Sequence, residues 1–186
     1  MKKIWIFVLA LMLISFGCEQ PNKKDDSKES AEKPLKNNNE LKAMDIGTLK
    51  SGLGMEGKEE GGQFKVTIPQ NDLNVMVDGF KIIPPMGLGS WAAFAPTSAQ
   101  TMVMGDIVVT EKDLKPVQQE IIQQGLTVTA IHNHFVRNEP DVMYMHIGGM
   151  GSEEKLAKSL KAIFDKVTEI RGADPSAVEM SSVENT

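Results

Sequence analysis

The chain has few thiols, few aromatic rings and few histidines. Its 186 residues include one cysteine, one tyrosine, two tryptophans and three histidines. A single cysteine cannot form a disulfide within the chain, nor can it supply the several thiolates of a cysteine-type zinc site. We therefore expect any metal or catalytic chemistry to use nitrogen and oxygen atoms.

The apolar run at the start of the chain is too short to cross a bilayer. Residues 4–16 are uncharged and mostly apolar, and they follow Lys2 and Lys3. Spanning a bilayer takes about 20 apolar residues, whereas the apolar region of a secretory signal takes about 7–15. The start of the chain therefore predicts a signal peptide over residues 1–18.

The predicted signal ends at Ser15-Phe16-Gly17-Cys18, where a small residue directly precedes the lone cysteine. This arrangement resembles a bacterial lipobox, in which the cysteine is lipidated and becomes the mature N-terminus. The usual pattern has Leu in the place of Ser15 and a small residue in the place of Phe16. We predict that a lipid on Cys18 anchors the exported chain to a membrane of the cell envelope. The alternative is a plain signal peptide with an incidental cysteine.

Beyond Cys18 the chain has almost no apolar side chains to bury. Residues 19–40 contain one large apolar residue, Leu35. A segment of such composition stays disordered. We predict a solvated tether over residues 19–40 that holds a folded domain away from the membrane surface.

Positive charge is also scarce. The formal net charge is −5, and removal of the signal leaves 18 basic against 25 acidic residues, a formal charge of −7. A nucleic-acid-binding surface needs a basic patch or stripe. The composition therefore excludes nucleic acid as an expected partner.

The remaining residues, 41–171, are enough for one domain. Apolar residues alternate as in half-buried strands in some segments and recur at helical spacing in others. The predicted strands cover residues 63–69, 74–85, 91–96, 101–110, 126–135 and 142–147; one helix begins after Thr110 or Asp113 and ends at Gly125, and another runs from Ser152 to Arg171. A strand–helix–strand unit favours a right-handed parallel crossover. We predict an α+β fold with a mixed sheet and both helices on one face, followed by a flexible tail over residues 172–186.

All three histidines lie in one short stretch, on two adjacent predicted strands. Side chains alternate between the two faces of a strand. In the first strand, His132 and His134 therefore share a face with Val128 and Ala130. In the second strand, His146 lies on the face opposite that of its two neighbours in the chain.

The pairing register of these two strands decides whether the histidines meet. If His134 pairs with Tyr144, then His132 lies directly across from His146. Opposed residues have Cβ atoms about 4.5–5.5 Å apart, so three imidazoles would converge on one patch of the sheet. A slip of one residue would move His146 to the other face.

Glu139, at the tip of the predicted hairpin, adds a carboxylate to this stretch. Three histidines with one carboxylate suit zinc, iron, manganese or nickel, of which we prefer zinc. We predict a metal site of His132, His134, His146 and Glu139. Glu139 would be a fourth ligand or, alternatively, a general base. Without a metal, the imidazoles would be hydrogen-bonded residues of a polar sheet face.

Other residues are weaker candidates. Asp106, Asn133 and Tyr144 are placed to support the metal ligands from behind. Trp91 is expected in the core, with partner contact as the alternative. Arg137 is expected to be a solvated loop residue, with binding of an anionic ligand as the alternative. The ten methionines that remain after the signal favour packing over a copper(I) site.

Several longer motifs occur in order: DLNVMVDG, GLGSWAAF, MVMGDIVVTEKDLKPV, VTAIHNH and EPDVMYMHIGGMG. Together they resemble the LppY/LpqO lipoprotein family over residues 45–170. The motif residues of that family fall on His132, Asn133, His134, Glu139, Tyr144, Met145 and His146. Family members commonly carry Pro-Arg where this chain has Pro140-Asp141, which removes any role of that arginine here. The resemblance implies a bacterial envelope lipoprotein and a domain of unknown function, and it supplies no reaction.

Together these features favour an envelope-anchored lipoprotein that binds a divalent transition metal. One alternative is a metal-dependent hydrolase or cupin-like metalloenzyme, with an open metal position that activates water. Another is a metal-free module that recognises an envelope partner or a small ligand through the same sheet face. We make no prediction of enzyme activity, because no separate base lies at a recognisable spacing.

Overall fold

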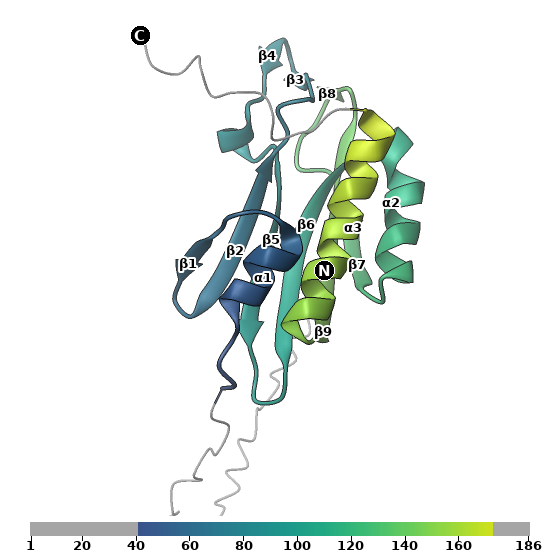
Figure 1. The fold of residues 1–186 in the computed structure, drawn as a ribbon. Coiled ribbons are helices and arrows are strands. Elements are labelled where there is room, and N and C mark those ends of the chain that lie inside the picture. Colours follow the sequence, from purple (N-terminus) through teal and green to yellow (C-terminus); the bar gives the residue numbers. More distant parts are fainter. Residues whose placement is uncertain (1–40, 173–186) are drawn as a thin grey trace, which may run out of the picture. The chain divides into compact units, whose positions relative to one another are not determined.

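The computed structural model describes residues 41–172 (Figure 1). The predicted signal peptide, the lipidated Cys18, the tether over residues 19–40 and the tail beyond Gly172 lie outside the described residues and stay predictions. None of the helices in the described part is long and apolar enough to cross a membrane.

Three α-helices, one short 3-10 helix and nine strands make up the described part of the chain. In chain order these are α1 (Ile46–Leu53), β1 (Lys58–Glu60), β2 (Gln63–Pro69), β3 (Met76–Val77), β4 (Phe80–Lys81), η1 (Pro84–Met86), β5 (Gly89–Pro96), β6 (Thr101–Thr110), α2 (Glu111–Gln123), β7 (Thr127–His132), β8 (Asn138–Glu139), β9 (Val142–Gly151) and α3 (Glu153–Arg171). The sequence pattern predicts most of these elements and misses α1, β1, η1 and β8. The predicted α+β class is confirmed, with the strand-helix-strand-strand-helix order in the C-terminal half.

The main sheet has six strands in the order β1-β2-β5-β6-β9-β7, and a second sheet has the order β4-β3-β8. The crossover rule predicts that β6 and β7, which flank α2, become parallel neighbours. In the structure β9 lies between them and pairs antiparallel with both, so β6 and β7 run in the same direction without pairing with each other. Each pair of hydrogen-bonded strands in the described part is antiparallel.

The helix ends follow from local capping chemistry. Thr110 and Asp113 form a capping box at the start of α2, which decides between the two predicted starting points. At α3, the Ser152 side chain accepts a hydrogen bond from the Lys155 backbone N–H. Gly172 ends α3 with a φ of 70°, a left-handed conformation that glycine adopts without strain.

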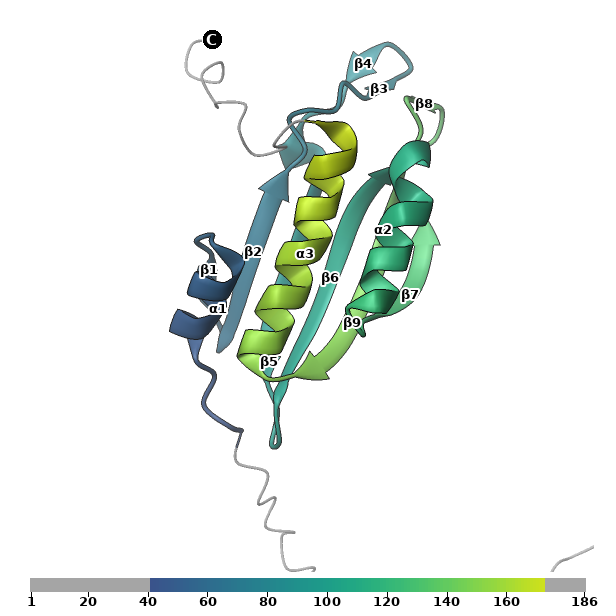
Figure 2. The ribbon, with the colours of Figure 1, turned by 45° about the vertical axis from the view of Figure 1, so that its right-hand side comes forward.

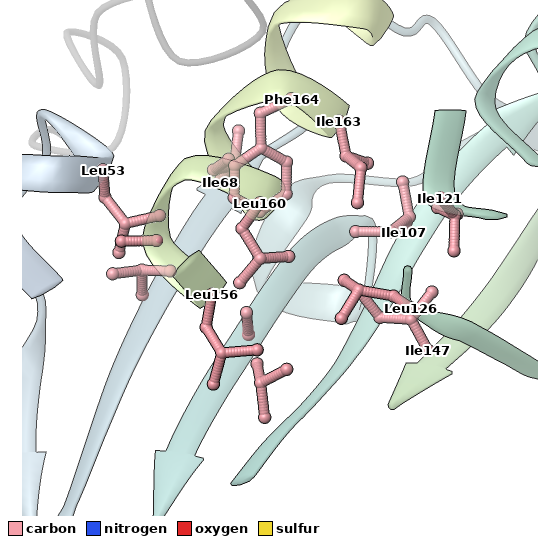
Figure 3. Close-up of a cluster of buried hydrophobic side chains, with 14 of the residues drawn as sticks. Leu53, Ile68, Ile107, Ile121, Leu126, Ile147, Leu156, Leu160, Ile163 and Phe164 are labelled. Carbon is pink, nitrogen blue, oxygen red and sulfur yellow. The ribbon is translucent and has the colours of Figure 1, made fainter. Parts of the chain in front are cut away.

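The hydrophobic core lies between the three helices and one face of the six-stranded sheet, which we call the covered face (Figures 1 and 2). Leu156, Leu160 and Ile163 of α3 point down onto the strands (Figure 3). Ile107 and Ile147 of β6 and β9 meet them from below and are buried. Full burial of one such side chain contributes about 1.5–3 kcal/mol.

The opposite face of the sheet is covered at one end only, by the segment that contains β3, β4 and η1. A second hydrophobic cluster forms there from Val75, Ile82, Leu88, Val108, Val142 and Tyr144. In the β3–β4 hairpin, Asp78 and Gly79 have positive φ angles of 48° and 85°, as a two-residue turn requires. The rest of this face carries the exposed Met104 and the half-buried Trp91, and we call it the open face.

Candidate metal centre

The pairing of β7 with β9 differs from the predicted register by two residues. His132 pairs with Tyr144, and Ala130 pairs with His146. The strand β7 also ends at His132, so His134 lies in the following loop. A shift of two keeps every side chain on its face, and His132 and His146 therefore still share the open face.

A bulge in β7 changes one further expectation. The register shifts between Val128 and Ala130, so that Val128 pairs with Ile147 of the covered face. Val128 accordingly packs against the main core, while Ala130 stays opposite His146. The prediction that Val128 and Ala130 share a face is wrong, because an extra residue in one strand reverses the alternation.

The three imidazoles nevertheless converge. Their candidate ligand atoms all lie within 4.8 Å of one another. The Nε2 atoms of His132 and His146 are 2.6 Å apart. The ring centroid of His134 lies 5.0 Å from that of His132 and 6.4 Å from that of His146.

Tyr144 holds His134 in this group, although His134 lies outside the strand. The two rings stack with centroids 3.4 Å apart and planes inclined by 11°. Tyr144 itself is buried, and its hydroxyl donates a 2.8 Å hydrogen bond to the backbone carbonyl of Gly87. Burial, with a further contribution from the Asp106 charge, raises the pKa of Tyr144 to about 12. Tyr144 therefore acts as a neutral support for His134.

Asp106 places a carboxylate behind the imidazoles. It lies on β6 directly opposite His146 in the strand register. Its Oδ1 atom is 3.9 Å from His146 Nδ1, and its Oδ2 atom is 3.9 Å from His134 Nε2. The residue is 3% exposed, and Oδ1 has no hydrogen-bond partner.

Desolvation disfavours charge on two residues of the site, Asp106 and His134. Desolvation raises the pKa of Asp106, against the opposing influence of the nearby histidines. Desolvation also lowers the pKa of His134, although the Asp106 carboxylate opposes that change. The neutral imidazole, which is the form that binds metals, is therefore favoured at His134.

The structure does not bring Glu139 into the cluster. Glu139 lies in β8, where it pairs with Met76 of the second sheet. Arg137, in the same loop, donates hydrogen bonds to the carboxylate of Asp78 in the β3–β4 hairpin. This loop is therefore directed toward the second sheet, and Glu139 is not part of the group of three histidines that could hold a metal. Its role as a ligand or a base stays a prediction. The carboxylate that reaches the imidazoles is Asp106.

Two other predicted residues have smaller roles. Asn133 is exposed, and its backbone carbonyl oxygen lies 3.4 Å from His132 Nδ1. Trp91 is half-buried on the open face, opposite Asp106 on the neighbouring strand. It belongs to neither hydrophobic cluster, so the expected core position of Trp91 is wrong.

The fold and the cluster define an α+β domain with three histidines and a buried carboxylate on the open face of its sheet. A family model described as Domain of Unknown Function (DUF1259) matches residues 47–166, and the chain belongs to this family. No curated protein and no solved structure matches the chain. The family match supplies no reaction and does not carry the LppY/LpqO name, so that resemblance stays a prediction.

Proposed function

We propose that the chain is a metal-binding protein in which His132, His134 and His146 hold one divalent transition metal ion. The observation that carries this proposal is the convergence of their ligand atoms within 4.8 Å of one another. Three imidazole nitrogens suit zinc best, with iron, manganese and nickel as alternatives. The DUF1259 match is compatible with this role.

Asp106 favours a metal site over a set of hydrogen-bonded histidines. A buried carboxylate oxygen without a partner is costly unless a positive charge lies nearby. The ion pairs found for Asp106 are to His134 and His146, which carry charge only when protonated. A metal cation beside neutral imidazoles supplies the positive charge at neutral pH. It also lets His146 donate Nδ1–H toward Asp106, an arrangement that orients metal-bound histidines in many proteins.

The geometry needs only a small adjustment to accept the ion. Zinc–nitrogen bonds of about 2.0–2.1 Å in a tetrahedral site separate the nitrogens by about 3.3 Å. The 2.6 Å between the Nε2 atoms of His132 and His146 therefore widens by about 0.7 Å on binding. His134 lies in a loop, so its side chain can approach the ion without disturbing the sheet.

A metal-dependent hydrolase is the second candidate, and one observation favours it. The cluster has three histidine ligands and faces the part of the sheet that no helix covers (Figure 2). Three protein ligands with an open fourth position are the arrangement that activates water in zinc enzymes. In that case Asp106, and not Glu139, would accept the proton.

The location of the protein is a separate proposal. The apolar run of residues 4–16, the lone Cys18 and the polar segment that follows support a lipoprotein of the bacterial cell envelope. The LppY/LpqO resemblance agrees with this location. Labelling with a radioactive fatty acid in cells tests it, and a Cys18→Ser variant that still takes up the label would exclude lipidation at this residue.

Metal analysis tests the binding proposal. The full chain is purified without an affinity tag of histidines, stripped with a chelator, reloaded with zinc and measured by mass spectrometry. We expect one zinc ion per chain in the unchanged protein and in the control Lys161→Met, an exposed residue of α3, and loss of zinc in His132→Ala and His146→Ala. Cobalt substitution should give the visible spectrum of a nitrogen-ligated tetrahedral ion. A protein that stays metal-free, with an unchanged melting temperature in excess zinc, would refute the proposal.

A further inference from the structure

The open face beside the histidines has a glycine where its packing would allow a side chain. Gly148 on β9 lies opposite Met104 on β6, two residues along the strand from His146. A Cβ atom added at Gly148 would come no closer than 3.8 Å to another atom. Packing therefore does not require glycine at this position, and its missing side chain leaves free space beside the histidine cluster.

Across the sheet from Gly148 lie two apolar residues, Met104 and Ala93, and then the positively charged Lys65. Met104 is 55% exposed and pairs with Ala93 of β5, which in turn pairs with Lys65 of β2. The Lys65 ammonium lies 4.5 Å from the centre of the Trp91 ring, and therefore above β5. Neighbouring strands are about 4.8 Å apart, which puts this ammonium about 10 Å from β9 and its histidine.

Buried side chains block the other side of the histidine cluster, toward the second sheet. Toward the second sheet, Tyr144 packs with Val108 and Leu88 in a buried cluster. The ring of Phe135 meets Tyr144 edge-on at 6.1 Å on the same side. The open face leaves a path for a metal-bound molecule over Gly148 and Met104 toward Lys65.

We propose that the surface formed by Gly148, Met104, Trp91 and Lys65 binds an elongated small molecule that has an acidic group at each end and an apolar middle. This inference rests on the proposed metal site. One acidic group takes the open position of the metal, and the other meets the Lys65 ammonium. The apolar middle lies over Gly148 and Met104, so the ligand matches the surface in charge at both ends and in polarity between them.

Binding of simple carboxylates to the zinc-loaded full chain tests this inference by calorimetry. Suberate has two carboxylates joined by a long methylene chain, octanoate has one carboxylate, and succinate has two that are close together. An exposed ion pair contributes up to about fivefold in affinity. We expect suberate to bind about fivefold more tightly than octanoate, and succinate to bind more weakly than both because it cannot span the strip.

Variants locate the ends of the ligand. Lys65→Met should reduce the affinity for suberate to that for octanoate and leave octanoate binding unchanged. Gly148→Leu should weaken both, because the new side chain occupies the path of the ligand while zinc content stays the same. Lys161→Met, on the solvent side of α3, is the matched control and should keep the preference for suberate. Circular dichroism and zinc content verify that each variant is folded and loaded.

The outcomes separate this inference from the proposal on which it rests. If the unchanged chain does not take up zinc, both are overturned. If it takes up zinc but binds suberate and octanoate equally, the inference about the ligand alone is overturned. A preference for suberate that survives in Lys65→Met also overturns it, because the second acidic group would then lie elsewhere.

Discussion

The two faces of the six-stranded sheet differ in how the surroundings of their buried residues satisfy them. On the covered face, Phe94, Ile107 and Ile147 are buried against helices and are satisfied by packing alone. On the open face, Asp106 is buried to a similar degree, yet one of its carboxylate oxygens has no hydrogen-bond partner. Both faces are built from the same strands, so the alternation of side chains separates residues that stabilise the fold by packing from a carboxylate that packing does not satisfy.

Two glycines of neighbouring strands show the same difference. On β6, a Cβ atom at Gly105 would lie 2.7 Å from the backbone carbonyl oxygen of Trp91, so the covered side has no room for it. On β9, a Cβ atom at Gly148 would meet nothing within 3.8 Å. Glycine is thus required by packing at one position and leaves free space at the other.

The largest effect is expected from a cavity on the covered face. Leu160 is fully buried, so Leu160→Ala should lower the free energy of unfolding by about 2–5 kcal/mol. Urea denaturation measures this change. Zinc binding by the fraction that stays folded should remain at one ion per chain. A loss below about 1 kcal/mol, or loss of zinc from a folded variant, would contradict the separation of the two faces.

Removal of a histidine from the open face should weaken zinc binding and leave the stability of the metal-free protein almost unchanged. Structural zinc binds with about 10–16 kcal/mol for four ligands, or about 3 kcal/mol for each. We expect His146→Ala to weaken zinc binding at least about 100-fold, measured by competition with a chelator. The free energy of unfolding of the metal-free protein should change by less than about 1 kcal/mol. A large loss of metal-free stability would assign His146 to the core instead.

Asp106→Asn should separate metal binding from stability. Loss of a carboxylate behind metal-bound histidines weakens binding about 10–100-fold. The metal-free fold should become more stable at neutral pH by about 1 kcal/mol, because a buried charge without a partner is removed. Asp165→Asn, an exposed carboxylate paired with Lys161 on α3, is the matched control and should change neither quantity substantially.

The stabilisation by Asp106→Asn should depend on pH, and the direction of the pKa shift of Asp106 gives the sign. Burial raises the pKa of Asp106 above its ordinary value of 3.8. A raised pKa means that the folded metal-free protein binds this proton more tightly than the unfolded chain. The stability that this proton contributes is fully present below pH 3.8 and is lost as pH rises through the raised pKa of Asp106. The advantage of Asp106→Asn should therefore appear only on the alkaline side of this window.

The smallest effect concerns Tyr144, which is the only tyrosine of the chain and can be titrated by its own absorbance. Its pKa of about 12 lies above the ordinary value of 10. The stability linked to this proton is fully present below pH 10 and is lost as pH rises toward 12. Tyr144→Phe, which removes the hydrogen bond to Gly87, should cost about 0.5–1.5 kcal/mol. Ionisation near pH 10 in the folded protein would refute the buried position.

The candidate site shows what alternation predicts and what it misses. Alternation places His132 and His146 on one face, and that holds because the actual register differs by an even number of residues. The predicted register of β7 against β9 was wrong by two residues. The strand β7 ends at His132 and contains a bulge, which the sequence pattern does not reveal. His134 joins the cluster through its stacking on Tyr144, a contact outside any regular strand.

The two carboxylates that the sequence suggested, Glu139 and Asp106, lie at very different distances from the histidines along the chain. Glu139 is close to the histidines in the chain, whereas Asp106 lies 40 residues before His146. Proximity in sequence favours Glu139, but the pairing of β6 with β9 places Asp106 beside His146. The signal available in the sequence was modest: a charged residue in a strand otherwise made of apolar and small residues.

The sequence by itself determined the class of the fold, the two main helices and the set of histidines that share a face. These follow from local periodicity and capping, which depend on residues a few positions apart. Only the tertiary structure decided that β9 lies between β6 and β7 and that Glu139 lies in another sheet. It also placed Asp106, which the sequence offered as a weaker candidate, beside His146. The physical reason is that strand pairing joins backbone edges from distant segments, and side-chain alternation within each strand does not specify which edges meet.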